Sequence, residues 1–175
     1  MVESPNLPTP EEIHALFWLI FDTLEDEVRD VLRRWWARYD AEAPKIVTDP
    51  GAFATDVTYM AGFGTTIQLR IDRLADRKHS LLRAFYHELA HFYIAAVGQH
   101  APAEYDNRRD VHESGATKLT KRFTDELKRS PLKRKALRAH PLIERFNRVF
   151  DFSPLYIGDR VFAARLASEW ASEAR

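Results

Sequence analysis

The 175-residue chain contains no cysteine, which excludes both a disulfide framework and a zinc site built on thiolates. Its 26 basic side chains balance 26 acidic ones, so net charge gives no reason to expect a polyanion as partner. The apolar run at residues 15–21 is too short to span a bilayer, and acidic rather than basic residues precede it. We therefore expect a cytoplasmic protein that makes no contact with a membrane.

The length and the composition of the chain predict one folded domain covering residues 1–175. Hydrophobic residues make up 45% of the chain and charged residues 30%, as in ordinary globular proteins, and 175 residues can bury a sizeable core. Within this domain we expect four parts. They are a disordered start at residues 1–8, a long N-terminal helix at 9–43, a catalytic core at 53–127 and C-terminal helices at 128–175.

The start of the N-terminal helix is marked by its first four residues. Thr9 can cap the helix, Pro10 suits its first position, and Glu12 completes a capping box with Thr9. Apolar residues then recur at helical spacing as far as Tyr39, and Pro44 stops the pattern. A single helix with one broad apolar face is predicted from this periodicity.

Two short strands and a helix are predicted after this segment. Residues 55–60 and 66–71 have strand character around a connection at 61–64, and alternation in the second strand predicts one buried face. Residues 80–97 have apolar side chains at helical spacing, and Gly98 is a stop signal.

The most informative residues lie inside this predicted helix, where His87-Glu88-Leu89-Ala90-His91 reads HExxH. Residues four apart share one face of a helix, so His87 and His91 can bind a single ion. Glu88 is then close enough to take a proton from a water molecule on that ion, which is the arrangement of zinc hydrolases. The alternative is a surface helix with two solvated histidines. The apolar neighbours of the motif disfavour it, because buried imidazoles need partners.

A catalytic zinc site usually has three protein ligands and one open position. Glu113 is our candidate for the third ligand, on a helix predicted to open at Val111 after a polar loop at residues 97–110. Ser114, Gly115 and Ala116 would let this helix pack closely against the first. The remaining candidates are His112, Glu104, Asp106 and Asp110.

These features together resemble the ImmA/IrrE-type metallopeptidases, a branch of the zincins whose third zinc ligand is a glutamate. The resemblance covers about residues 66–127 and includes the strand at 66–71, the HExxH helix and the Glu-x-x-Ala stretch at Glu113. It departs from the family at Thr117, where Asn is usual, and at Ala90, where Gly is frequent. The resemblance implies an α+β, mainly helical zincin-like domain, with a small hairpin packed on the HExxH helix.

The expected function is that of a zinc-dependent peptidase acting on a specific protein substrate. His87, His91 and Glu113 would hold Zn²⁺, and Glu88 would be the general base. The resemblance implies that the substrate is a regulatory protein, and an exposed sheet edge could receive it as an added strand. The alternative is an inactive zincin scaffold that serves as an interaction module or a nucleic-acid-associated module.

Charge is distributed unevenly along the chain. Acids outnumber bases ten to five in residues 3–45, whereas bases outnumber acids eleven to three in residues 118–148. Nucleic acid binding is one interpretation of the basic segment. A solvated face, or packing against the acidic N-terminal helix, is the more usual outcome.

The last part of the chain is predicted to form short helices. Pro131 and Pro141 divide it, and residues 159–174 have helical character. Tyr156 and His140 could stabilise an oxyanion, although a structural role is the commoner one for such residues.

Overall fold

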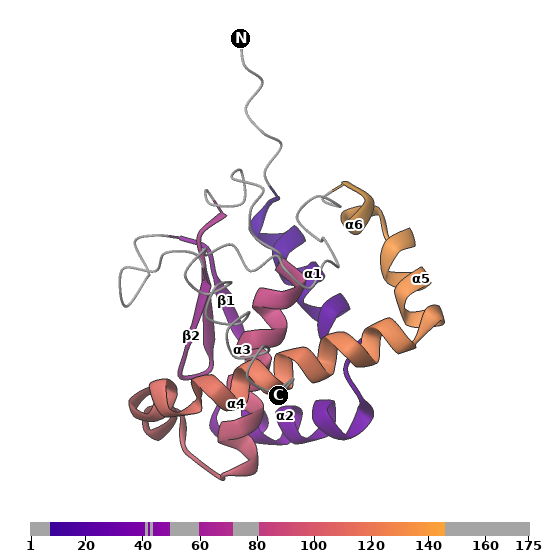
Figure 1. Cartoon of the computed structure of the whole chain (residues 1–175). Coiled ribbons are helices and arrows are strands. Elements are labelled where there is room, and N and C mark those ends of the chain that lie inside the picture. Colours follow the sequence, from indigo (N-terminus) through magenta and orange to yellow (C-terminus); the bar gives the residue numbers. More distant parts are fainter. Residues whose placement is uncertain (1–7, 41, 43, 50–59, 72–80, 146–175) are drawn as a thin grey trace.

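The computed structural model describes residues 8–40, 42, 44–49, 60–71 and 81–145 (Figure 1). The described part is mainly helical and has one small sheet, in agreement with the expected α+β class. The predictions for residues 1–7, for most of the strand at 55–60, for Tyr156 and for the helix at 159–174 lie outside the described residues. No helix within the described ranges is both long and apolar enough to cross a membrane.

The N-terminal segment forms two helices, so the prediction of one long helix over residues 9–43 was wrong. Helix α1 spans Pro10–Phe21 and α2 spans Asp26–Tyr39. The predicted start is confirmed, because Thr9 Oγ1 accepts the Glu12 N–H at 3.2 Å and the Glu12 carboxylate accepts the Thr9 N–H at 2.8 Å.

The chain bends after α1, at residues 22–25. The Thr23 hydroxyl donates to the carbonyl of Ile20, and a side chain that bonds to nearby backbone in this way competes with the helical pattern. Acidic residues then open α2, where the helix dipole favours them. Apolar periodicity continues through the bend because both helices pack against the same central helix, α3 (Leu81–Val97).

The sheet has three strands in the order β1-β3-β2. Strands β2 (Met60–Phe63) and β3 (Thr66–Leu69) form an antiparallel hairpin, with Gly64 at a positive φ of 58° in the turn. Strand β1 (Lys45–Val47) pairs parallel with β3 and was not predicted, because three residues are too few to show a periodic pattern.

Helix α3 lies at the centre of the fold and contacts α1, α2, α4 and β2 (Figure 1). Its predicted extent is confirmed over the described residues, from Leu81 to Val97. The rings of Phe17 and Phe85 are 5.4 Å apart, and those of Trp36 and Phe92 are 6.0 Å apart, so aromatic packing joins α1 and α2 to α3. Such contacts hold the HExxH helix in a fixed position.

Helix α4 spans Pro102–Arg129, and the prediction of a loop as far as residue 110 was wrong. Pro102 occupies the start of the helix, and the Glu104 carboxylate accepts the N–H of Ala101 at 3.4 Å. Only residues 98–101 separate α3 from α4, which brings the two helices back against each other. Helices α5 (Pro131–Ala139) and α6 (Pro141–Arg145) each begin at a proline, as predicted.

Candidate metal centre

The two histidines of the HExxH motif face the same space. The Nε2 atoms of His87 and His91 are 3.3 Å apart, with ring planes at 89° to each other. His91 is fully buried and the His87 side chain is 16% exposed, so the pair lies inside the protein with one member partly reachable by solvent. The helical spacing of four residues therefore brings the two imidazoles together, as expected.

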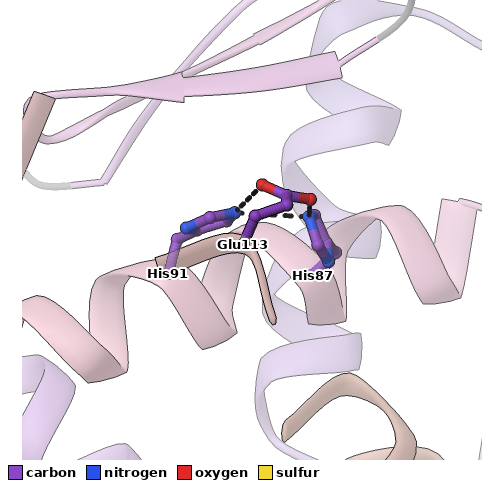
Figure 2. Close-up of side chains that lie close together, drawn as sticks. All are labelled: His87, His91 and Glu113. Atoms are coloured by element: carbon purple, nitrogen blue, oxygen red, sulfur yellow. Dashed lines mark hydrogen bonds and ion pairs between the residues drawn. The ribbon is translucent and has the colours of Figure 1, made fainter. Parts of the chain in front are cut away.

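Glu113 completes this group from α4 (Figure 2). Its Oε1 lies 2.8 Å from His87 Nε2 and its Oε2 lies 3.0 Å from His91 Nε2. Close packing of the two helices makes this possible, because a Cβ added to Gly115 would be 3.1 Å from Ile94 Cδ1. The expected close approach at this glycine is confirmed.

The Glu113 carboxylate is held in its charged form. Burial alone would raise its pKa, but hydrogen bonds from His87 and His91 outweigh that effect and hold the pKa well below its usual range. The group therefore offers an anionic oxygen ligand at neutral pH beside two imidazole nitrogens.

Thr120 supports the site from α4 and was not anticipated from the sequence. Its hydroxyl donates to the Ala116 carbonyl at 2.7 Å, and its Oγ1 lies 3.3 Å from Nδ1 of His87. With its own proton engaged, Oγ1 can accept the N–H of that nitrogen, so His87 can keep a proton on Nδ1 and turn its Nε2 toward the site. Thr120 is seven residues after Glu113, two helical turns along the same face, and this spacing was the available signal.

Glu88 is not one of the grouped side chains that could hold a metal ion. It is 3% exposed, and its Oε2 accepts the Gly62 N–H at 2.8 Å. The sequence placed Gly62 in a connection between strands, whereas it lies within β2, close against α3. A glycine inside a strand often marks such a close approach, and this was the signal that sequence reasoning did not use.

The other candidate ligands are engaged elsewhere or cannot be placed. The His112 ring packs against His100 at 5.8 Å, and Glu104 Oε1 lies 3.6 Å from His100 Nδ1. Asp106 and Asp110 lie on α4, but their side chains are outside the described part. His140 accepts the N–H of Leu142 at the junction of α5 and α6. Among the described residues, only His87, His91 and Glu113 form a group able to hold a metal.

The spacing of these ligands fits a small divalent cation. Nitrogens about 2.0–2.1 Å from a tetrahedral zinc stand about 3.3 Å from each other. The two Nε2 atoms have this separation, and the carboxylate oxygens lie on the same side of them. The donor set of two imidazoles and one carboxylate is one that zinc accepts in catalytic sites.

Comparisons with protein-family models, with curated proteins and with solved structures found no match.

Proposed function

We propose that the protein is a zinc-dependent peptidase that cleaves a specific protein substrate. The observation that carries this proposal is the convergence of His87, His91 and Glu113 in one group, with Glu88 beside them on α3. A purely structural metal site has no need of a buried carboxylate next to its ligands. The side chains at this position are therefore those that metal-assisted hydrolysis requires.

The three ligand residues leave room for the reaction. A tetrahedral ion held by these three ligands would keep one position for water or substrate, and the partial exposure of His87 and Glu113 would give access to it. Zinc held there would polarise the scissile carbonyl and lower the pKa of a water molecule to about 7. The contact with Thr120 keeps His87 Nε2 directed into the site.

Glu88 moves the proton in this mechanism. Its carboxylate takes a proton from the attacking water and then delivers it to the nitrogen of the departing amine. The hydrogen bond from Gly62 orients the carboxylate, and the surrounding apolar residues keep bulk water away from it. Both proton transfers can be made by one carboxylate only if its position is fixed, and the contact with β2 supplies that restraint.

The sheet beside the site supports the proposal of a peptide substrate. Strand β2 is an outer strand in the order of the described sheet, and its Gly62 contacts the Glu88 side chain. An extended peptide pairing with β2 would place its backbone next to the proposed zinc ligands. The resemblance to ImmA/IrrE-type peptidases adds the expectation that the chain cut is a regulatory protein.

The test compares the wild-type protein with Glu88→Gln, which preserves shape while removing the base. Both zinc-loaded proteins are incubated with a cell extract, and newly formed protein N-termini are identified by mass spectrometry. We expect termini that appear only with the wild type, and a loss of about a hundredfold or more in their rate of formation with Glu88→Gln.

Equal zinc content and equal melting temperature of the two proteins would show that the substitution affects chemistry alone. Identical sets of termini from the two proteins would remove Glu88 from the mechanism. Zinc binding without any new terminus would favour the alternative, an inactive scaffold that binds its partner.

A further inference from the structure

A cluster of basic residues lies where α4 ends and α5 begins. Residues 128–143 contain six lysines and arginines and no aspartate or glutamate. We call the following six side chains the basic surface: Lys128, Arg129, Lys133, Arg134, Lys135 and Arg138. They belong to the last turn of α4 and to α5.

Several basic side chains elsewhere in the described ranges have carboxylate partners. Arg29 and Arg33 contact Asp22, Lys45 contacts Asp40, and Lys121 contacts Asp125 on the same helix. This pairing neutralises much of the positive charge on those parts of the molecule.

Two cations of the basic segment at residues 118–148 contact the bend between the acidic N-terminal helices. Arg122 Nη2 lies 2.7 Å from Glu25 Oε2, and Lys133 Nζ donates to the Thr23 carbonyl at 3.1 Å. The expected packing of basic residues against the acidic N-terminal segment therefore accounts for two cations.

Three cations of the basic surface are not neutralised by a carboxylate in the described ranges. Lys128, Arg129 and Lys135 form no ion pair with any carboxylate in the described ranges, and Arg129 bonds only to the backbone oxygen of Asp125. Arg129 and Lys135 are exposed. A cluster of exposed cations without local counter-charges produces a positive potential that attracts anions.

We propose that the basic surface binds the phosphate backbone of a double-stranded nucleic acid. Helix α5 has nine residues and is therefore about 13 Å long. A duplex of that length carries about eight phosphate charges, enough to meet the four cations on α5. Contacts of this kind give affinity without sequence preference.

The composition of the surface favours a duplex over other partners. Residues 128–143 contain no aromatic side chain on which the bases of a single strand could stack. Leu132, which is 81% exposed, is the one large hydrophobic side chain fully open on α5, too little apolar area for insertion into a bilayer or for a hydrophobic partner.

The test measures binding of the full-length protein to a fluorescein-labelled 20-base-pair duplex by anisotropy, at salt concentrations between 50 and 200 mM. With about four phosphate contacts, we expect affinity to fall by about a hundredfold over this range. In the double variant Arg129→Gln and Lys135→Gln, the slope of log affinity against log salt should decrease by about two, equally for two unrelated duplex sequences.

The matched control is the double variant Arg33→Gln and Lys45→Gln, which removes the same charge from paired positions. It should bind like the wild type. Absence of duplex binding at 50 mM salt would overturn the proposal, and so would equal weakening by both double variants. Preference for an unlabelled polyglutamate competitor over the duplex would point to an acidic protein partner instead. None of these outcomes depends on zinc or on cleavage, so the proposed peptidase activity is tested separately.

Discussion

The backbone N–H of Gly62 donates a hydrogen bond of 2.8 Å to Oε2 of Glu88, joining β2 to the HExxH helix inside the protein. Because Gly62 has no side chain, it also leaves space for this carboxylate. A Cβ at this position would lie 2.9 Å from Glu88 Oε2 and 3.1 Å from Phe92 Cζ. The strand therefore fixes the proposed base both by a hydrogen bond and by its lack of a side chain.

We expect Gly62→Ala to reduce the rate of substrate cleavage by about ten- to a hundredfold, because a small displacement of a positioned group is enough to lose its contribution. Zinc content should not change, since the atoms nearest to the new methyl group belong to Glu88 and Phe92, neither of which is a proposed ligand. The control is Ala61→Ser, whose side chain points to the opposite face of the strand. Unchanged cleavage by Gly62→Ala would show that the contact does not matter for catalysis.

The second prediction concerns the metal ligands. Wild-type protein should bind one equivalent of zinc, and His87→Ala, His91→Ala and Glu113→Gln should each lower the zinc affinity strongly. His112→Ala should have little effect, because its ring faces His100 rather than the site. Elemental analysis after dialysis measures the stoichiometry. Retention of zinc by Glu113→Gln together with its loss from His112→Ala would refute the assignment of the third ligand.

Thr120 provides a test of how the ligands are held. Thr120→Val removes the acceptor for His87 Nδ1 while keeping the shape of the side chain. We expect zinc affinity to fall by about tenfold, the lower end of the effect of losing such a support. Thr124→Val is the control, because Thr124 makes the same kind of backbone hydrogen bond one turn later, to the Thr120 carbonyl. Equal affinities of the two variants would contradict the role of Thr120.

Because Tyr86 is buried, we expect the protein to become less stable at alkaline pH. Burial raises the pKa of this phenol, despite its hydrogen bond to Thr23. Above a pH of about 10 the unfolded chain releases the proton while the folded chain retains it, so the free energy of unfolding falls as pH rises.

Tyr86→Phe lacks this effect and loses about 1 kcal/mol through the missing hydrogen bond. The stability advantage of the wild type over this variant should shrink by about 0.8 kcal/mol between pH 8.5 and pH 10.5, measured by urea unfolding. A constant difference over that range would mean that the phenol ionises normally in the folded protein.

The sequence was sufficient for the parts of the structure that depend on regular helical spacing. The HExxH helix and the position of its two histidines follow from residues four apart. Glu113 was found as a glutamate on the next predicted helix, beside small residues that predicted close packing. The helix starts at Pro10, Pro131 and Pro141 were predictable because proline has so few places in a helix.

The parts that could not be predicted depend on contacts between distant residues. The bend at residues 22–25 interrupts no apolar pattern, and Tyr86, which bonds to Thr23 there, is 63 residues away. Likewise, nothing local marks Gly62 as the partner of Glu88, 26 residues later. Thr120 lies two helical turns after Glu113, a spacing that the sequence shows. Its role depends on the orientation of His87, which spacing alone does not specify.

The bend between α1 and α2 has a consequence for the order in which the protein can assemble. Thr23 is bonded to Tyr86 and, through its carbonyl, to Lys133, while Glu25 is bonded to Arg122. These partners are 63, 110 and 97 residues further along the chain. During synthesis the N-terminal helices leave the ribosome well before α5, and contacts at such separation form late because the intervening chain must first be ordered. The bend between α1 and α2 therefore completes its contacts only after α5 has been made.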